Sequence, residues 1–555
     1  MRRPQPYCLS VRPVRPIRAS VCASVGAFAR SLAVSVGLAV SVEASAQVGR
    51  VAPSAPFAPF DRALAIATVD SAWSRINQTY YDPLFHGLDW SAVRRTVRHR
   101  AVRAQTNAEV RGIVEGMFGQ LGDSHFALIP AEIVAQWSDS APGASGKSGV
   151  QAESGESDES DESSAAGESD ESGAPSAAGG SLGEVGLEFR LLGGEVVVSR
   201  VLPRSAAADA GVGLGWGVER VGEMDVKRFV SQRLDLPAGA SRRMAALQLP
   251  LSLMARTMGA TGSTLRLTLR NAAGARVQLA IVRREVTAEV TRFGHLPPQV
   301  VRFESERFDD ALGCVGVVRF NIWMTPVMPQ LDDAMMAMQR CRGLVLDLRG
   351  NVGGVTAMMM GIAGYYLDSA VSLGAMTSRG TTLRYLANPR RSDRRGRPLA
   401  PFAGLMAILV DGLSVSTSEM FAAGMQDLAR ARVFGEETAG QALPAMLTRL
   451  PNGDVMQYVV GDYASPAGRR LEARGVTPDV LVPLTRTNLL AGRDAAMLAA
   501  RKWIDERTER VATGAGELTY CTKRIICTYR GVGDAPITLG GGDRRRWARV
   551  AGRSG

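Results

Sequence analysis

Two long apolar runs, GLVLDL and LMAILV, are the strongest hydrophobic signals in the second half of the chain. The first ends at Leu348 and opens into a turn that contains Gly353 and Gly354. The second enters a glycine-containing turn, after which a helical segment begins near Ser416. A run of strand length that leads through a turn into a helix is typical of a parallel strand buried on both faces. The pattern therefore predicts an α/β core.

Other patterns fill the first half of the chain. Between residues 60 and 135, apolar positions recur at helical spacing, and Asp89 and Asn107 are the expected N-caps. From residue 181 to residue 286, short alternating strands and frequent turn residues predict a small β-rich domain. The methionine-rich runs MMAMQRC and TAMMMGIAG predict core helices, because thioethers alone are poor ligands for hard metal ions.

Ser416 lies where the turn between a strand and a helix would present a hydroxyl. The start of a helix offers unpaired N–H groups and positive potential, which stabilise a developing oxyanion in acyl transfer. The spacing of Ser416 and Glu419 equally matches a capping box, in which two side chains satisfy N–H groups of the first helical turn. Taken alone, the motif favours the cap, so the choice depends on other segments.

The turn with Gly353 and Gly354 lets backbone N–H groups approach a ligand without interference from a Cβ atom. A phosphate site is the alternative interpretation. The segment lacks both a G-K-[ST] ending and G-x-G-x-x-G spacing, so nucleotide binding has no support here.

Two further segments supply groups for acid–base chemistry. LGDSHFALIP holds Asp123, Ser124 and His125, and RRLEARGVTPDVLVP holds Glu472 just before a G-V-T-P-D turn. A mechanism based on histidine has few candidates, because the chain has only four histidines: His86, His99, His125 and His295. The simpler interpretations are a structural histidine at a helix end and an ordinary surface carboxylate.

Taken in their order along the chain, these four segments resemble the serine peptidases of the C-terminal-processing and tricorn-core family. The similarity runs roughly from residue 60 to residue 485 and rests on the strand-D-x-R-x-N-x-G-G element, the S-x-S-E helix start and the G-V-x-P-D turn. In the processing-protease branch a lysine downstream of the serine is the general base. Gln441 stands at that position here, and an amide has no basic lone pair at neutral pH. The chain therefore resembles the tricorn-core branch.

The resemblance implies a role for each matching residue. Ser416 would be the nucleophile and His125 the general base, while Ser124 would orient the imidazole and Glu472 would hold Ser124. The oxyanion hole would be formed by N–H groups of Gly354 and Thr417. Substrate contacts would come from Gly353 and Gln441.

The β-rich segment resembles a PDZ domain inserted before the core. In that family a G-L-x-F loop binds the terminal carboxylate of a peptide through backbone N–H groups, and the peptide adds a strand. The loop here would be formed by Gly186, Leu187, Glu188 and Phe189, with Glu188 expected to lie beside the incoming carboxylate. The alternative is a packing domain that only gates the active site.

The ends and the insertion carry other signals. Residues 1–46 combine arginines, a short apolar run and an A-x-A pattern, which predicts an export signal. Residues 136–180 are rich in Ser, Gly and acidic residues, which predicts a disordered insertion. Removal of the signal leaves an even number of cysteines that an oxidising compartment could pair, although buried free thiols fit equally at the first two: Cys314, Cys341, Cys521 and Cys527.

We therefore expect a serine endopeptidase that is exported to the periplasm or secreted, acts on protein or peptide substrates and uses no cofactor. The formal net charge is +11, but no nucleic-acid reader is apparent and no stable membrane span is expected after signal removal. The expected architecture is an N-terminal helical bundle (60–135), a PDZ-like domain (181–286), a ClpP/crotonase-like α/β core of ββα units (300–485), and a C-terminal helix and basic tail (486–555). The alternative function is a catalytically inactive protein that binds a peptide or an apolar ligand on the same fold.

Overall fold

The computed structural model of the chain describes residues 60–138, 181–236, 240–291, 294 and 298–512, together with strands at 517–522, 526–530 and 537–540. The expected export signal (1–46), residues 139–180 of the expected insertion, and His295 lie outside the described residues.

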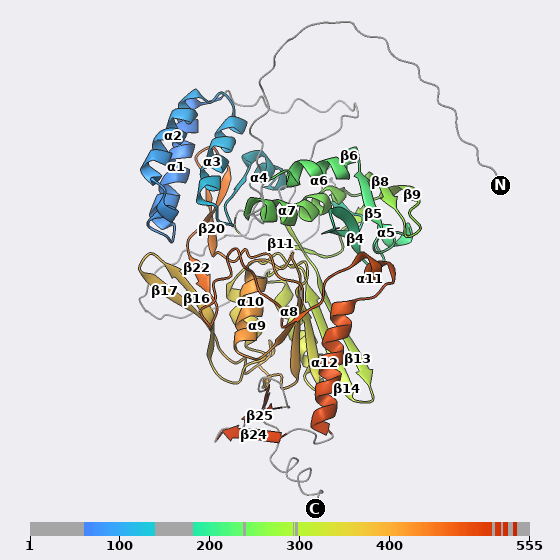
Figure 1. Ribbon diagram of the computed structural model, residues 1–555. Helices are drawn as coiled ribbons and strands as arrows, with labels where there is room; N and C mark the ends of the chain where they lie inside the picture. Colours follow the sequence, from blue (N-terminus) through green and yellow to red (C-terminus); the bar gives the residue numbers. More distant parts are fainter. Residues whose placement is uncertain are drawn as a thin grey trace, which may run out of the picture. The chain divides into compact units, whose positions relative to one another are not determined.

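The helices that the apolar periodicity predicts are α1 (Arg62–Thr79), α2 (Trp90–Arg103) and α3 (Asn107–Leu121). The 3₁₀ turn η1 (Phe85–Gly87) and helix α4 (Ala131–Ser138) were not predicted, and α4 extends into the first residues of the expected disordered insertion. Helices α1, α2 and α3 lie side by side (Figure 1). Asp89 caps α2 as predicted, because its carboxylate accepts a hydrogen bond from the N–H of Ala92 (2.8 Å). The predicted cap of α3 is wrong by one residue. Thr106 has an extended backbone and its hydroxyl accepts from the N–H of Glu109 (3.1 Å), whereas Asn107 is already helical.

Residues 181–286 form a β-rich unit with its own hydrophobic core. Its main sheet has the antiparallel order β3-β4-β5-β8-β9, so β3 is an edge strand, and a smaller sheet has the order β10-β2-β7. Helix α7 packs against β3. The elements are β2 (Leu182–Glu184), β3 (Leu187–Leu192), β4 (Glu195–Val201), α5 (Ala206–Asp209), β5 (Gly217–Val221), β6 (Met224–Asp225), α6 (Val226–Leu234), α7 (Ala240–Thr257), β7 (Gly259–Ala260), β8 (Thr264–Arg270), β9 (Arg276–Val282) and β10 (Arg284–Glu285).

A six-stranded sheet of order β13-β14-β15-β18-β19-β23 organises the core. Strand β13 is antiparallel to β14, and the remaining neighbours are parallel. The two predicted buried strands are β15 and β18. The six strands are β13 (Phe303–Asp310), β14 (Gly313–Phe320), β15 (Gly343–Asp347), β18 (Leu405–Val410), β19 (Arg432–Gly435) and β23 (Val480–Leu481).

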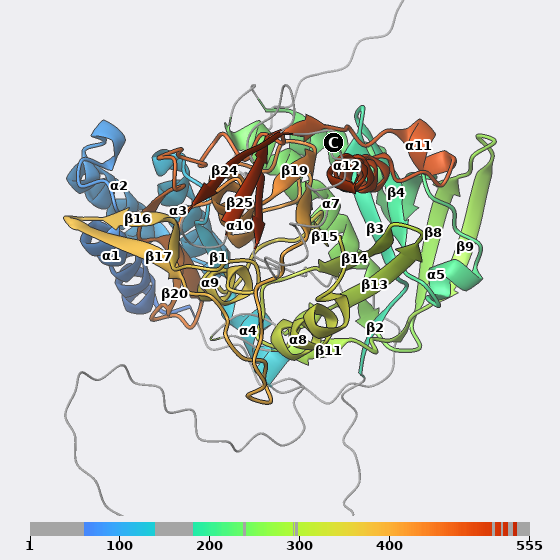
Figure 2. The same cartoon turned by 90° about the horizontal axis from the view of Figure 1, so that it is seen from below.

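Helices cover both faces of this sheet (Figures 1 and 2). Leu344 and Leu346 of β15 face the cluster that includes α8 (Val327–Met338), α9 (Ala357–Ala363) and α10 (Thr417–Asp427), whereas Val345 faces the cluster of α12 (Ala495–Ala512). This alternation explains why β15 is apolar at nearly every position. The methionine-rich runs are core helices as predicted, since Met335 and Met359 are fully buried.

Strand β1 (Ala127–Ile129) joins the helical unit to the core, because it pairs with β21 (Val455–Val459). Arg111 of α3 strengthens this junction through two hydrogen bonds to the buried carboxylate of Asp454 (2.8 and 2.9 Å). The residues just before β1 are therefore held against the core. The remaining core strands are β16 (Val371–Ser378), β17 (Thr381–Ala387) and β22 (Asp462–Ala464) in one sheet, β20 (Ala445–Arg449) beside β21, and the pair β11 (Glu289–Thr291) and β12 (Gln299–Val301).

After the core, α11 (Arg486–Leu490) leads to α12 and then to three strands: β24 (Glu517–Thr522), β25 (Ile526–Arg530) and β26 (Ile537–Gly540). The spacing of Cys521 and Cys527 is compatible with a hairpin, whereas β26 was not predicted. Cys521 and Cys527 are paired positions of the hairpin formed by β24 and β25. Cys314 and Cys341 form a disulfide, so these two are not free thiols. Among the helices that the structure describes, none has the length and apolar character needed to cross a bilayer.

Candidate active site

Ser416 occupies a strained turn between β18 and α10. Its backbone has φ 57° and ψ −117°, and a positive φ at a non-glycine residue costs on the order of 1–3 kcal/mol. Its N–H group donates to the carbonyl oxygen of Gln441 (2.8 Å) and to the carboxylate of Glu419 (3.1 Å). The Glu419 half of the predicted capping box is therefore formed, and it helps to hold this turn.

Burial distinguishes Ser416 from its neighbouring serines. Ser414 and Ser418 are fully buried, and their hydroxyls donate to the carbonyl oxygens of Leu348 (2.8 Å) and Asn351 (3.1 Å). Ser416 is partly exposed. It is therefore the serine of this turn that a substrate can reach.

Glu419 is a buried carboxylate without a cationic partner among the described residues. Besides Ser416, it accepts hydrogen bonds from the hydroxyl of Thr438 (2.5 Å) and from the N–H groups of Gly440 (2.7 Å) and Gln441 (2.9 Å). Burial raises its pKa to about 7, although these hydrogen bonds oppose the shift. One side chain thus fastens both the Ser416 turn and the segment that lies against it.

The glycine-rich turn lies directly against Ser416. A Cβ atom at Gly353 would come within 2.7 Å of the Cβ of Ser416, and one at Gly354 would collide with the carbonyl oxygen of Trp323. The carbonyl oxygen of Gly354 accepts from the hydroxyl of Thr417 (3.1 Å). Within the described residues, the N–H groups of Gly354 and Thr417 donate to no protein acceptor. Both are therefore free to bind an oxygen atom of a ligand.

The structure brings Ser124, His125 and Glu472 together. The Ser124 hydroxyl lies 2.7 Å from Nδ1 of His125 and 3.0 Å from Oε2 of Glu472. The N–H group of Ser124 donates to the other oxygen of Glu472 (3.0 Å). His125 has a positive φ of 62°, which is uncommon for a non-glycine residue. Hydrogen bonds thus connect these three residues.

Burial changes the pKa values of His125 and Glu472. It lowers the pKa of His125 to about 4, because the charged imidazolium loses hydration. It also raises the pKa of Glu472 to about 7, against the hydrogen bonds from Ser124 and Ala442. His125 is therefore neutral at physiological pH, and Glu472 changes its charge near neutrality.

Backbone contacts connect the trio to Ser416. Gln441 accepts from the N–H of Ser416, and the N–H of the next residue, Ala442, donates to Glu472 (3.1 Å). The structure shows no hydrogen bond between His125 and Ser416. The His125 ring makes its hydrogen bond through Nδ1, so Nε2 has no hydrogen-bond partner among the described residues and can accept a proton.

Gln441 is buried beside the serine turn. Its amide nitrogen lies 3.0 Å from the sulfur of Met244 in α7, and its amide oxygen is buried without a hydrogen-bond partner. A thioether is a weak acceptor, so both ends of the amide have unused capacity. This residue can bind a polar ligand but cannot act as a base. Among the described residues, no group of three or more His, Cys, Asp and Glu side chains is arranged to hold a metal ion.

The predicted peptide loop lies at the start of edge strand β3. A Cβ atom at Gly186 (φ 81°) would collide with Ser205, so the close turn requires glycine. Leu187 and Phe189 point into the core of the β-rich unit, which leaves only their backbone for a ligand. The expected place of Glu188 is wrong. Its carboxylate forms ion pairs on the side of the loop that faces the core.

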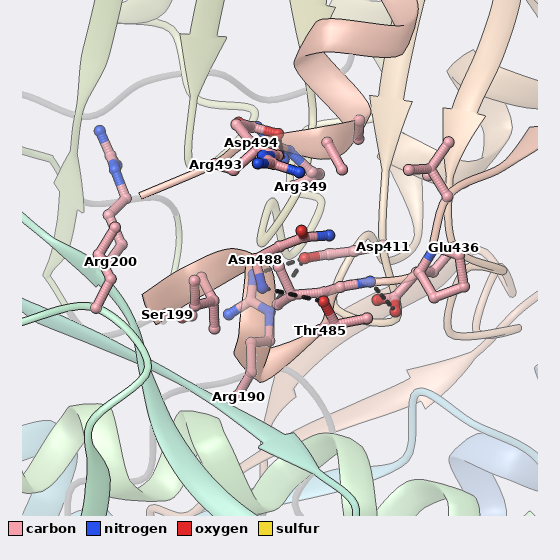
Figure 3. A pocket seen from close by; sticks show the side chains of 18 of the residues that line it. Arg190, Ser199, Arg200, Arg349, Asp411, Glu436, Thr485, Asn488, Arg493 and Asp494 are labelled. Atoms are coloured by element: carbon pink, nitrogen blue, oxygen red, sulfur yellow. Dashed lines mark hydrogen bonds and ion pairs between the residues drawn. The ribbon is translucent and has the colours of Figure 1, made fainter. Parts of the chain in front are cut away.

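Those ion pairs line a cavity of about 270 Å³ between the β-rich unit and the carboxyl ends of the parallel strands (Figure 3). Glu188 contacts Arg200 (3.2 Å) and Arg319 (3.3 Å), and Arg190 contacts Asp411 (2.6 Å). The cavity is lined neither by Ser416 nor by His125 or Glu472. This cavity is therefore separate from the candidate catalytic groups.

Sequence reasoning gave no role to Asn351, which shapes the glycine-rich turn. Its buried amide nitrogen donates to the carbonyl oxygen of Phe320 (2.8 Å), and its amide oxygen accepts from the N–H of Gly353 (3.0 Å). The sequence feature that could have indicated this role is the position of Asn351 in the D-x-R-x-N-x-G-G element. Because its side-chain amide both donates and accepts, Asn351 connects the end of β14 to the glycine-rich turn after β15.

Comparison with known proteins places these residues in a family. Residues 314–482 match the model described as Peptidase family S41, and residues 70–119 match the Tricorn protease C1 domain. A carboxyl-terminal-processing protease of Picosynechococcus sp. is 24% identical over 436 residues, which cover 77% of this chain and 86% of that protein. A probable CtpA-like serine protease of Staphylococcus epidermidis is 25% identical over 172 residues, 31% of this chain and 34% of that protein.

Among solved structures, a photosystem II D1 C-terminal processing protease aligns with a TM-score of 0.49 and 21% identity, covering 78% of this chain and 98% of that one. The family models and the sequence relatives carry the assignment. The chain is a serine-type peptidase whose residues 314–482 are similar to peptidase family S41, and it is related to carboxyl-terminal-processing proteases.

Proposed function

We propose that this peptidase is an exported endopeptidase that hydrolyses peptide bonds through Ser416, His125, Ser124 and Glu472. The observation that carries the proposal is the bridge from His125 through the Ser124 hydroxyl to Glu472 (2.7 and 3.0 Å), together with a partly exposed Ser416 in a strained backbone conformation. A serine hydroxyl needs a base that is itself oriented, and this bridge supplies the orientation.

The direction of the hydrogen bonds determines which nitrogen of His125 acts as the base. Ionised Glu472 can only accept, so the Ser124 O–H donates to it and the Ser124 oxygen accepts from Nδ1–H of His125. The lone pair then resides on Nε2. In catalysis, Nε2 removes the proton of Ser416 while the serine oxygen bonds to the substrate carbonyl carbon, and the resulting imidazolium donates that proton to the leaving amine. Water then hydrolyses the acyl-enzyme by the same route.

The tetrahedral intermediate places a negative charge on the former carbonyl oxygen. The free N–H groups of Gly354 and Thr417 would stabilise that charge, with help from the positive end of α10. Gly353 allows the glycine-rich turn to lie against Ser416, because a Cβ atom there would come within 2.7 Å of the Cβ of Ser416.

Substrate would be bound by the neighbouring units. The β-rich unit acts as a PDZ-like domain in this proposal, and a peptide would extend its sheet at the open edge of β3, beside the loop of Gly186, Leu187 and Phe189. Gln441 would donate to and accept from the substrate backbone near the cleaved bond. The residues of the G-L-x-F loop would contribute only backbone groups, since the side chains of Leu187 and Phe189 are buried.

Export to the periplasm or secretion is part of the proposal. The disulfide between Cys314 and Cys341 supports it, because structural disulfides form and persist in oxidising compartments.

The test is hydrolysis of a denatured protein substrate by purified Ser416→Ala and His125→Ala variants. We expect each to lower kcat by at least about 10³-fold, with a change in unfolding free energy of at most about 2 kcal/mol for the serine variant. Ser369→Ala, at an exposed hydroxyl in the turn after α9, is the matched control and should keep full activity. Normal turnover by Ser416→Ala would overturn the proposal.

A further inference from the structure

A second carboxylate lies directly beside the His125 turn. Three donor groups converge on Oδ2 of Asp123: the hydroxyl of Tyr80, the hydroxyl of Tyr81 (3.2 Å) and Nε2 of His86 (3.3 Å). Tyr80 is fully buried, and the Asp123 side chain is 11% exposed. Such a set of donors around one oxygen fixes the position of the carboxylate.

Three segments of the helical unit build this cluster. Tyr80 is the C-cap of α1, and His86 lies in η1. Asp123 follows Gly122, the left-handed C-cap of α3 (φ 74°). The core contributes Arg379, which donates to the carbonyl oxygen of Tyr80 (2.7 Å). The cluster therefore holds helices of the N-terminal unit to one another and to the hairpin of β16 and β17.

The hydrogen bonds to Asp123 persist over the physiological pH range because of the chemistry of their donor groups. Burial, with the charge of Asp123 beside it, raises the pKa of both Tyr80 and Tyr81 well above the usual value for tyrosine. Both hydroxyls therefore keep their protons and donate across the physiological pH range. His86 has a carboxylate at each ring nitrogen, with Asp82 3.3 Å from Nδ1.

From this geometry we propose that Asp123 is a positioning residue for the general base, a role that rests on the proposed function of His125. The hydrogen bonds of Asp123 hold the first residue of the Asp123–Ser124–His125 turn against the helical unit. The hydrogen bonds of Glu472 hold Ser124 against the core. The turn is thus held from both sides. His125 needs this restraint, because its positive φ (62°) is unfavourable for a non-glycine residue.

Asp123 also acts through its charge on Glu472, the carboxylate that holds Ser124. Burial is the main cause that raises the pKa of Glu472, and the nearby Asp123 carboxylate adds to the shift. The other titratable and charged groups around the cluster are His86, Asp82, Arg379 and the ion pair of Asp462 and Arg470 next to Tyr81. Removal of the Asp123 charge should therefore move the titration of Glu472 to lower pH.

The experiment compares Asp123→Asn with the wild-type enzyme in steady-state kinetics from pH 5 to pH 9. We expect kcat to fall by about 10- to 100-fold, KM to change less than threefold, and the acid limb of kcat/KM to shift to lower pH. Tyr81→Phe removes one donor and keeps the ring, so it should give a smaller loss of kcat. Asp70→Asn is the matched control in the same unit, because Asp70 pairs with Arg94 and Arg98 and shares no partner with Asp123.

The outcomes separate this inference from the proposed function. If Ser416→Ala and His125→Ala are inactive but Asp123→Asn has wild-type kcat and an unshifted limb, the inference on Asp123 fails alone. If Ser416→Ala or His125→Ala remains active, the proposed function fails first. If Asp123→Asn does not fold, Tyr81→Phe decides: wild-type kcat in the folded Tyr81→Phe enzyme contradicts the positioning role.

Discussion

Glu472 accepts hydrogen bonds from both the N–H group and the hydroxyl of Ser124, at 3.0 Å each, although the two residues are 348 positions apart in the chain. This contact crosses from the helical unit to the core. It connects two distant segments of the chain. In the proposed function this contact orients His125, and that role depends on the charge of Glu472.

The first prediction concerns pH. Below a pH of about 7, Glu472 becomes protonated and can donate to Ser124, which favours the wrong tautomer of His125. The value of kcat/KM should therefore rise as pH increases through about 7 and level off above it. Protonation of His125 does not cause this limb, since its pKa is lowered to about 4.

The Glu472→Gln variant tests the assignment of that limb. The variant should lose at least about tenfold in kcat/KM at pH 8 and should no longer show a limb near neutrality. An unchanged limb in this variant would mean that another group titrates.

The second prediction concerns the close approach of the glycine-rich turn to the nucleophile. Gly353→Ala would place a methyl group 2.7 Å from the Cβ of Ser416 at φ 87°, so we expect kcat to fall by about 10²-fold or more. Gly361→Ala is the control, because it lies in α9 with no atom within 4 Å of the added Cβ. That variant should keep full activity and gain about 0.5–1 kcal/mol of stability. Equal kinetics for the two variants would count against the assignment of this turn.

The third prediction concerns Glu188. Burial opposes its charge, but the guanidinium groups of Arg319 and Arg200 hold its pKa below the usual value. Glu188→Gln should therefore lower the free energy of unfolding by about 1–3 kcal/mol in a denaturant titration. It should leave KM for peptides with a free C-terminus within about twofold, because the carboxylate is already paired. A marked decrease of KM would show that Glu188 repels substrate, as the sequence first suggested.

The fourth prediction concerns the disulfide of Cys314 and Cys341, which are 27 positions apart. Replacement of both by alanine should lower the free energy of unfolding by about 2–4 kcal/mol, because the unfolded chain regains loop entropy. Denaturant unfolding of the oxidised protein and of the double variant measures the difference. Identical unfolding curves would show that the bond contributes nothing and would weaken the argument for export.

Short sequence patterns predicted those elements whose structure depends mainly on residues close together in the chain. The apolar runs gave β15 and β18, and the S-x-S-E segment gave the start of α10. The cap of α3 was misplaced by one residue, because Thr106 and Asn107 are both good capping residues and only the backbone conformation separates them.

Contacts between distant segments were beyond the reach of such patterns. The hydrogen bond from Tyr80 to Asp123 joins residues that are 43 positions apart, and no periodic pattern in the sequence indicates it. The place of Glu188 depends on Arg319, 131 positions away in the core. The order of motifs brought His125 and Glu472 into one hypothesis, but the pairing of β1 with β21 is what brings His125 to the core.

The most direct test of the account is labelling of the mature enzyme with a serine-directed fluorophosphonate, followed by peptide mapping. We predict a single modified residue, Ser416, with labelling lost in both Ser416→Ala and His125→Ala. The neighbours Ser414 and Ser418 should stay unmodified, since both hydroxyls are buried and hydrogen-bonded. Labelling at either neighbour, or undiminished labelling of the Ser416→Ala enzyme, would contradict the assignment of the nucleophile.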